Sequence, residues 1–131
     1  MAGFLDSDGS IYAYKRTDGK RPYYRVFVTV TNSNHDICDW FMARTCMGNV
    51  YKSSYGENEK HSQVWRWIVQ KGDDSVRLLR MLLPELRVKR NRAEIAINLL
   101  ELRDCRPSLE VEAKKEYLFT QLKQLSKRGP R

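Results

Sequence analysis

The first ten residues, MAGFLDSDGS, constrain the fold of this chain more than any other stretch. They combine a short apolar helical turn, two small residues (Ala2 and Gly3) and two carboxylates (Asp6 and Asp8) with a following Gly9. Because Ala2 and Gly3 have almost no side chain, a second helix can approach this backbone closely. Glycine adopts left-handed dihedral angles without penalty, so Gly9 is predicted to end the helix and to leave both carboxylates in its last turn. The segment therefore predicts a short, closely packed helix with an acidic end.

The acidic end is a candidate site for a divalent cation. Carboxylates in a last helical turn face the negative end of the helix dipole, which costs about 0.3–1 kcal/mol. A cation would relieve that cost, and carboxylate and carbonyl oxygens are the ligands that Mg²⁺ prefers. The alternative is a solvated Asp-Ser-Asp-Gly turn, because such turns are common. A calcium loop of the EF-hand type does not fit, since the glycine comes too early and no glutamate follows at the required spacing.

Residues 1–10 resemble the signature of the LAGLIDADG homing endonucleases, with Met1 in place of the leading leucine and Ser7 at the second alanine position. The resemblance extends through residues 28–32, 40–41 and 86–93, and so covers the chain to about residue 100. It implies an αββαββα fold of the α+β class. In that fold an antiparallel sheet carries its helices on one face and forms a DNA-binding saddle with the other.

The hydrophobic pattern of the chain predicts the same order of elements. Residues 11–16 and 23–32 alternate as two strands around an Asp-Gly turn at 17–20, and residues 50–55 and 61–70 predict a second hairpin around 56–60. Asn34 can cap a helix that Gly48 closes, with Ile37, Trp40 and Phe41 directed at the sheet. Further helices are predicted from residue 73 or 74 to Pro84, around residues 93–100, and from Ser108 to residue 125. Strands and helices segregated in this way favour a sheet with helices packed on one face.

The face of the sheet turned away from the helices is a candidate nucleic-acid surface. Alternation places aromatic, hydroxyl and guanidinium side chains on it, namely Tyr12, Tyr14, Arg16, Arg25, Thr29 and Arg66. Such groups suit groove reading, because arginine pairs with guanine edges and other cations contact phosphates. The alternative is an ordinary solvated sheet face. The net charge of +8 favours a polyanionic partner, whether DNA or RNA.

Length and composition predict one domain over residues 1–125 and a basic, flexible tail over 126–131. The three cysteines have neither paired nor metal-ligand spacing, which favours a reduced, cytoplasmic protein, or an organellar one if an organelle intron encodes it. No apolar run reaches the length of a membrane span, so we expect no membrane partner and neither a signal peptide nor a transit peptide.

The family resemblance also implies a mechanism. With one copy of the motif the chain would act as a homodimer, its two motif helices crossing at Ala2, Gly3 and Leu5. Asp8 would be the direct ligand of Mg²⁺, with the Ser7 carbonyl as a secondary ligand, and Mn²⁺ or Ca²⁺ could occupy the same site. Asp6 would support the helix end.

Two further positions correspond to groups that surround the attacking water in the family. Asn32 follows the second strand, where a glutamine is frequent, and Lys89 is the basic candidate early in the fourth helix. A close single-motif relative's lysine instead aligns with Asn91, and another basic position aligns with Asp36. Arg90 and Arg92 are equally suited to phosphate contact or to a solvated face.

The resemblance therefore implies a site-specific homing endonuclease that cuts a long pseudo-palindromic DNA site, as expected of an enzyme of intron or intein mobility. Asp8 favours this nuclease, whereas Asp36 and Asn91 favour a protein of the same fold that binds DNA without cutting it or assists RNA intron splicing. A basic RNA-binding structural protein is a third alternative.

Overall fold

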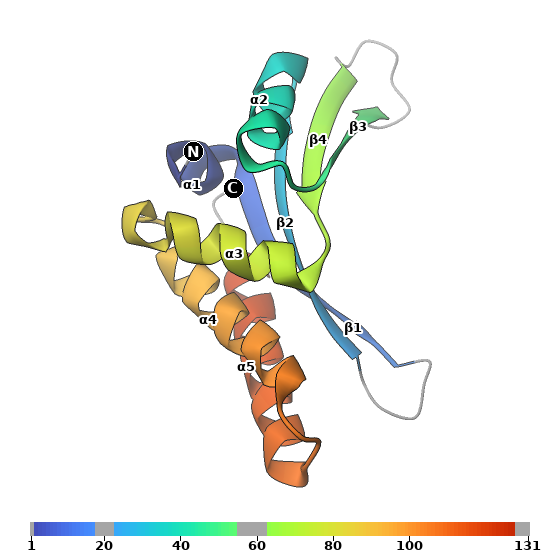
Figure 1. Cartoon of the computed structure of the whole chain (residues 1–131), viewed down its shortest axis with the longest axis vertical. Coiled ribbons are helices and arrows are strands. Elements are labelled where there is room, and N and C mark those ends of the chain that lie inside the picture. The colour runs from blue at the N-terminus through green and yellow to red at the C-terminus, as the bar shows by residue number, and fades with distance from the viewer. Residues whose placement is uncertain (1, 18–22, 55–62, 128–131) are drawn as a thin grey trace.

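The structure is a computed structural model of the 131-residue chain, and it describes residues 2–17, 23–54 and 63–127. The elements follow one another as the sequence predicts (Figure 1). They are α1 (Ala2–Asp8), β1 (Gly9–Arg16), β2 (Tyr23–Asn32), α2 (His35–Thr45), β3 (Asn49–Ser54), β4 (Gln63–Val69), α3 (Gly72–Leu82), the 3₁₀ turn η1 (Leu83–Glu85), α4 (Arg90–Glu101), the 3₁₀ turn η2 (Leu102–Asp104) and α5 (Leu109–Lys127). The predicted turn residues 18–20 and 56–60 lie outside the described part.

The four strands form one antiparallel sheet in the order β1-β2-β4-β3. Both predicted hairpins are confirmed, and β2 joins them by pairing with β4, with Val28 opposite Val69 and Asn32 opposite Trp65. The central position of β2 and β4 explains why both carry long apolar runs. The predicted α+β class and the antiparallel sheet are therefore confirmed.

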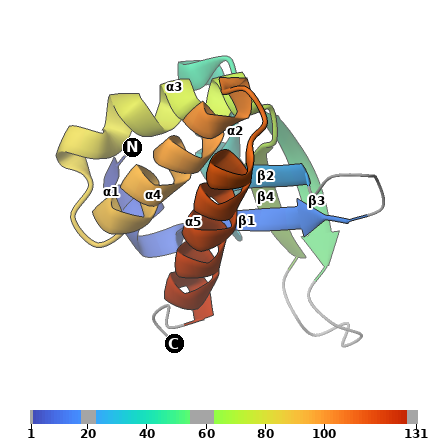
Figure 2. The ribbon, with the colours of Figure 1, turned by 90° about the horizontal axis from the view of Figure 1, so that it is seen from below.

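The helices lie on one side of the sheet and enclose the core (Figures 1 and 2). On the inner face of β2, Val26, Val28 and Val30 are at most 1 % exposed. Helix α4 faces the core with the predicted stripe of Ala93, Ala96, Ile97 and Leu100, all buried. Each large apolar side chain buried in this way contributes about 1.5–3 kcal/mol. The opposite face of the sheet is left without helices.

Helix ends follow the predicted capping side chains at two sites and depart from them at a third. Asn34 Oδ1 accepts from the Asp36 N–H at 2.9 Å, and Ser108 Oγ accepts from the Val111 N–H at 3.1 Å. Gly48 does not close α2, however. The helix ends at Thr45, and Cys46 adopts the left-handed conformation with φ 55° while its N–H donates to the Met42 carbonyl at 2.8 Å.

Position 9 requires a glycine because a side chain there would overlap Leu5. The sequence-based expectation of a left-handed turn at Gly9 was wrong. It is the first residue of β1, and Gly48 is the one glycine with positive φ among the described residues. A Cβ built on Gly9 would lie 2.3 Å from Leu5 Cδ1 and 2.7 Å from the Leu5 carbonyl oxygen. The glycine therefore allows the chain to pass from α1 into β1 over the buried Leu5 side chain.

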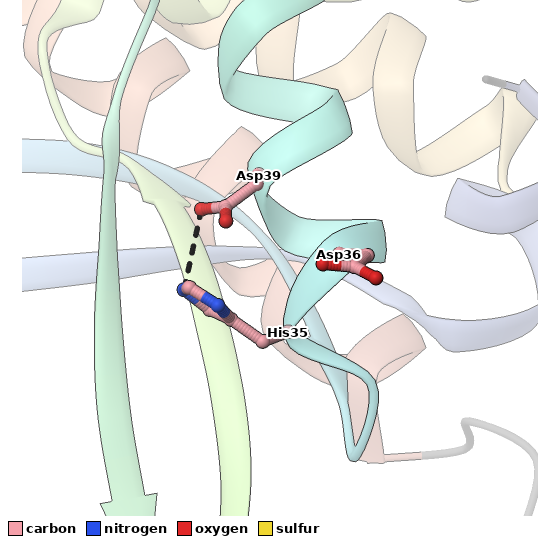
Figure 3. Close-up of side chains that lie close together, drawn as sticks. All are labelled: His35, Asp36 and Asp39. Atoms are coloured by element: carbon pink, nitrogen blue, oxygen red, sulfur yellow. Dashed lines mark ion pairs between the residues drawn. The ribbon is translucent and has the colours of Figure 1, made fainter.

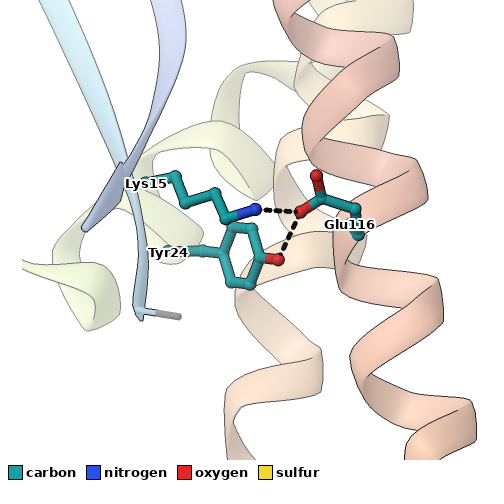
Figure 4. A network of polar contacts seen from close by, with 3 residues as sticks. All are labelled: Lys15, Tyr24 and Glu116. Carbon is teal, nitrogen blue, oxygen red and sulfur yellow. Dashed lines mark hydrogen bonds and ion pairs between the residues drawn. The ribbon is translucent and has the colours of Figure 1, made fainter. Parts of the chain in front are cut away.

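A polar network joins the C-terminal helix to the first hairpin. Lys15 Nζ donates to Glu116 Oε2 at 2.8 Å and the Tyr24 hydroxyl donates to the same oxygen at 2.5 Å (Figure 4). Hydrogen bonds from Lys15 and then from Tyr24 outweigh burial and lower the pKa of Glu116. Burial, followed by the hydrogen bond to Glu116, raises the pKa of the Tyr24 hydroxyl.

The described chain ends with helix α5, which runs to Lys127, two residues beyond the predicted end of the domain. Residues 128–131 lie outside the described part. Within that part the three cysteines are free, and none of its helices has the length and apolar character of a membrane span.

Candidate functional site

The acidic end of α1 leads directly into the sheet. Asp8 is the last residue of the helix and Gly9 the first residue of β1, with no residue between them. The backbone carbonyls of a helix end lack intrahelical partners and carry the negative end of the dipole. The predicted ligands, the Asp8 carboxylate and the Ser7 carbonyl, therefore belong to an oxygen-rich helix end, although the side chain of Asp8 lies outside what the structure describes.

The Asp6 carboxylate accepts hydrogen bonds from backbone N–H groups of the same chain. Its Oδ2 accepts from the Arg87 N–H at 2.8 Å and its Oδ1 accepts from the Lys89 N–H at 2.9 Å. Burial raises the pKa of this carboxyl, but the N–H groups of Arg87, Lys89 and Val88 together with the Lys89 charge bring the pKa below its ordinary value. Asp6 thus ties α1 to the segment that precedes α4, which is the supporting role that the sequence predicts. Of the two motif carboxylates, Asp6 is therefore engaged in hydrogen bonds, and Asp8 is the remaining candidate metal ligand.

Lys89 is buried at this junction, with 2 % of its surface exposed. Its ammonium group donates to the Asp6 backbone carbonyl, two residues before the end of α1. Lys89, the predicted basic residue early in the fourth helix, is the N-cap of α4 and lies beside the acidic helix end. The nearby Asn91, in the first turn of α4, is exposed.

Asn32 is the last residue of β2 and is only partly buried. Its Oδ1 accepts from the Asn34 N–H at 2.8 Å, which forms the turn from β2 into α2. Asn32 therefore has a structural role beside the one in orienting water that the sequence predicts.

The predicted dimer-contact residues of α1 differ in how far they are exposed within one chain. Ala2 and Leu5 are 6 % and 1 % exposed and pack inside the chain, so their side chains offer little surface to a partner. Gly3 is exposed, and a Cβ built on it would meet no atom within 4 Å. Beside it lie Phe4 and Trp40, 36 % and 40 % exposed, with ring centroids 6.2 Å apart. The sequence had directed Trp40 at the sheet, but it lies at the surface beside α1.

Strand pairing places all six predicted DNA-binding residues on the face of the sheet that the helices leave free. Tyr12 pairs with Phe27, Tyr14 with Arg25 and Thr31 with Arg66. Tyr14 is half exposed and Arg16 and Arg66 are exposed. We call this surface the open face; its other described side chains include those of Thr31, Tyr51 and Ile68, which the same registers place there.

Two side chains at the middle of the open face are buried. Thr29 is 5 % exposed and pairs with Ile68, which is 6 % exposed. Thr29 therefore offers little side-chain surface to a ligand. Thr29 is buried because β2 is a central strand and side chains of the neighbouring strands cover it. Alternation along one strand does not reveal this cover.

Phe27 is an open-face residue that the sequence interpretation left out of the site, and it lies at the centre of an aromatic cluster. Its ring contacts Tyr12 edge to face at a centroid distance of 5.3 Å and stacks with Tyr14 at 6.4 Å. The Arg25 guanidinium lies over the same ring, 5.2 Å from its centroid. A shallow pocket is lined by Tyr14, Arg16, Arg25 and Phe27, with Lys15 and Thr17. Alternation along residues 23–32 puts Phe27 on the same face as Arg25 and Thr29, and this is the sequence signal that could have found it.

A second group of polar side chains lies at the start of α2 and was not predicted as a site. His35, Asp36 and Asp39 offer ligand atoms within 4.8 Å of one another, and all three residues are exposed (Figure 3). His35 Nε2 pairs with Asp39 Oδ1 at 3.3 Å, and this ion pair is the interaction that Figure 3 marks among the three residues. The positive end of the helix dipole disfavours a cation there. The group is explained as an ion pair at a helix start.

No protein-family model and no curated protein matches the sequence. Solved structures do match it. The homing endonuclease I-CvuI, solved in complex with its target in the presence of Ca, aligns over 99 % of this chain and 81 % of its own, with 24 % identity and a TM-score of 0.82. The archaeal intron-encoded homing endonuclease I-Vdi141I, complexed with DNA, aligns over 99 % and 84 %, with 14 % identity and a TM-score of 0.82. The LAGLIDADG homing endonuclease I-GzeII, in complex with its DNA target, gives a TM-score of 0.72 at 12 % identity over 99 % of this chain but 44 % of its own.

The chain has the LAGLIDADG homing endonuclease fold. The αββαββα order predicted from the motif is confirmed, and the LAGLIDADG-like segment is the short helix α1 at the start of the sheet. Two helices follow the core of the fold in this chain, α4 and α5, and α5 is joined to the first hairpin by Glu116.

Proposed function

We propose that this chain is a site-specific, metal-dependent endonuclease that cuts double-stranded DNA as a homodimer. The observation that carries the proposal is the direct continuation of the acidic end of α1 into the first strand of the open face, at Asp8 and Gly9. A carboxylate for the cleavage site and a surface for the DNA are thereby joined without a linker. The LAGLIDADG fold and the DNA-bound state of similar structures support the same conclusion.

The donor set at the end of α1 fits Mg²⁺. It consists of oxygen ligands, which Mg²⁺ prefers, and the dipole of the helix end favours a cation. Asp6 is held by backbone N–H groups, so Asp8 is the motif carboxylate that would hold the metal, with the Ser7 carbonyl as second ligand. When bound, a divalent ion lowers the pKa of an attacking water and stabilises the leaving oxygen.

The remaining catalytic roles fall to side chains near this helix end. Lys89 supplies a buried positive charge next to α1, where negative charge develops on a scissile phosphate. Asn32 is proposed to orient water through its amide group, as the sequence predicts. Arg16, Arg25 and Arg66 contact phosphates or base edges from the open face.

The homodimer is proposed from the surface of α1 and from the single copy of the motif in residues 1–131. Gly3 leaves open space on α1, and the exposed Phe4 and Trp40 extend this apolar surface. A second copy of the chain would supply the second motif helix. Two copies would bring two Asp8 carboxylates to the two strands of one duplex.

The test is cleavage of a large randomised duplex library with Mg²⁺, with sequencing of the new ends. Asp8→Asn is the variant, and Asp104→Asn, an exposed carboxylate far along the chain on η2, is the matched control. We expect ends at one near-palindromic sequence with wild type and the control, and none with Asp8→Asn. Duplex binding without cleavage in the wild type would instead support a non-cleaving DNA-binding protein, and preference for structured RNA would support a role in splicing.

A second readout does not depend on cleavage. Binding of Ca²⁺ by the protein–duplex complex, followed as a rise in its melting temperature, is expected for wild type and Asp104→Asn and is expected to be lost in Asp8→Asn. An unchanged Ca²⁺ effect in Asp8→Asn would contradict the assignment of Asp8 as the ligand. Sedimentation of the free protein, with Gly3→Leu as the variant, tests the dimer.

A further inference from the structure

We propose that Phe27 reads the methyl group of a thymine in the major groove, and that the neighbouring Arg25 reads a guanine within about two base pairs of it. The proposal rests on the DNA-binding function proposed above and names which bases the open face selects. It starts from the position of Phe27, a side chain without polar atoms on a surface that is otherwise rich in hydroxyl and guanidinium groups.

The environment of Phe27 holds its ring in one place. Tyr12 contacts the ring from the neighbouring strand, Tyr14 stacks on it and the Arg25 guanidinium covers it at 5.2 Å. Arg25 is held in addition by the Gln70 carbonyl, to which Nη2 donates at 3.5 Å. Phe27 itself remains partly exposed. The cluster therefore presents a preorganised apolar surface, since these aromatic contacts fix the ring before a ligand arrives.

The chemistry of base edges decides what such a surface can select. A phenyl ring that covers a hydrogen-bonding base edge removes water from it and offers no partner in return, which costs free energy. The thymine C5 methyl is the apolar group that the major groove presents, and apolar side chains contact it. Phe27 therefore favours thymine by this contact and disfavours bases with only polar atoms at the same place.

The spacing along β2 connects Phe27 to Arg25. The two residues are two positions apart, so their backbones are separated by about 6.6–6.8 Å. Base pairs in a duplex are separated by about 3.4 Å, so this is two steps along the duplex. Arginine pairs in bidentate fashion with guanine O6 and N7. The expected half-site contains a guanine and a thymine no more than about two steps apart.

The experiment uses the full-length protein and the duplex selected by it from a randomised library. Each thymine is replaced in turn by deoxyuridine, which removes only the C5 methyl, and each guanine by 7-deazaguanine, which removes N7. Dissociation constants are measured for wild type, for Phe27→Ala and for the control Tyr117→Ala, an exposed aromatic on α5. Phe27→Gln is the second variant, in case Phe27→Ala fails to fold by circular dichroism.

In wild type we expect one thymine per half-site at which deoxyuridine weakens binding about fourfold, the equivalent of about 0.8 kcal/mol for one methyl group. The effect is expected to persist in Tyr117→Ala and to vanish in Phe27→Ala and Phe27→Gln. A guanine sensitive to 7-deaza substitution should lie within two steps of that thymine.

Three outcomes would overturn the inference. They are the absence of any methyl-sensitive thymine in wild type, a methyl effect that is unchanged in both Phe27 variants, and a sensitive guanine that lies elsewhere. If the protein binds duplex DNA in any of these cases, the proposed function stands while the inference fails. If no duplex is selected at all, the proposed function itself fails.

Discussion

Asp6 and Lys89 are joined in both directions: the Lys89 N–H donates to Asp6 Oδ1 at 2.9 Å, and Lys89 Nζ donates to the Asp6 backbone carbonyl. The side chain of each residue thus binds the backbone of the other. Since 83 residues separate them in the chain, this pair is a long-range connection between α1 and the start of α4. It determines where the acidic end of the helix lies.

Asp6→Asn is expected to lower the free energy of unfolding by about 1–3 kcal/mol, because an amide has one acceptor for the two N–H groups of Arg87 and Lys89. Urea denaturation at pH 7 without divalent ions measures the change. Asp104→Asn, whose side chain is 83 % exposed, is the control and should change the value by less than about 0.5 kcal/mol.

The same pair predicts a pH dependence for Asp6. Its pKa is lowered in the folded protein, so its contribution to stability is complete above the unfolded value of about 3.9 and is lost as the pH falls through the lower folded pKa. The difference between wild type and Asp6→Asn should therefore become smaller below about pH 4. A difference that stays constant to pH 2.5 would contradict the carboxylate's role.

A double-mutant cycle between Asp6→Asn and Lys89→Met should give a coupling free energy of about 0.5–3 kcal/mol. The two changes break different hydrogen bonds, but each of them also removes the attraction between the Asp6 carboxylate and the Lys89 ammonium group, so their effects should not add. Unfolding curves of the two single variants and the double variant provide the measurement. Additive effects would mean that the two residues stabilise the junction independently.

Gly9→Ala is expected to destabilise the protein by about 1–3 kcal/mol, because the new Cβ would overlap both the side chain and the backbone of Leu5. Gly3→Ala, on the preceding helix α1, is the matched control. Its Cβ meets open space, and alanine is favoured over glycine in a helix, so stability should stay level or rise by up to about 1 kcal/mol. Thermal melts at low protein concentration compare the two, and an equal loss in both would contradict the overlap at Gly9.

Glu116→Gln should lower stability at pH 7 by about 0.5 kcal/mol, a small value because the Glu116 side chain is 46 % exposed. The folded pKa of Glu116 is lowered, so the loss should be seen above about pH 4.3 and should disappear as the pH falls through the folded value. Urea midpoints from pH 3 to 8 measure it. Glu85→Gln, an exposed residue on η1, is the control and should show no such dependence.

Tyr24→Phe tests the alkaline side of the same network. The pKa of Tyr24 is raised in the folded protein, so stability should fall as the pH rises above about 10, where the unfolded tyrosine ionises. In Tyr24→Phe this part of the decline should be smaller. Tyr117→Phe, an exposed tyrosine on α5, is the matched control and should decline as wild type does.

Most of the fold could be predicted because its signals are local. Alternation gave β1 and β2, Asn34 and Ser108 marked helix starts through their own side-chain hydrogen bonds, and the stripe of α4 was periodic. The motif at residues 1–10 placed a carboxylate at the end of a helix. These features need only residues within a few positions of one another.

The features that were missed depend on residues far apart in the chain. The burial of Thr29 arises from neighbouring strands, and the need for Gly9 arises from the path over Leu5. Phe27 was on the correct face, but its contacts with Tyr12 on the neighbouring strand require the strand register. Periodicity predicts the face on which a side chain lies, but it does not predict which residues from other elements contact that side chain.

The absence of any residue between α1 and β1 has a consequence for the proposed nuclease. Gly9 directly follows Asp8, and Tyr12 is three residues from Gly9 along β1, about 10 Å at the rise of an extended chain. In the proposed nuclease, β1 therefore fixes the distance between the cleavage site and the base that Tyr12 contacts. Substitutions on the open face can change which bases are selected, but the offset between the selected bases and the cut is fixed by the length of the strand itself.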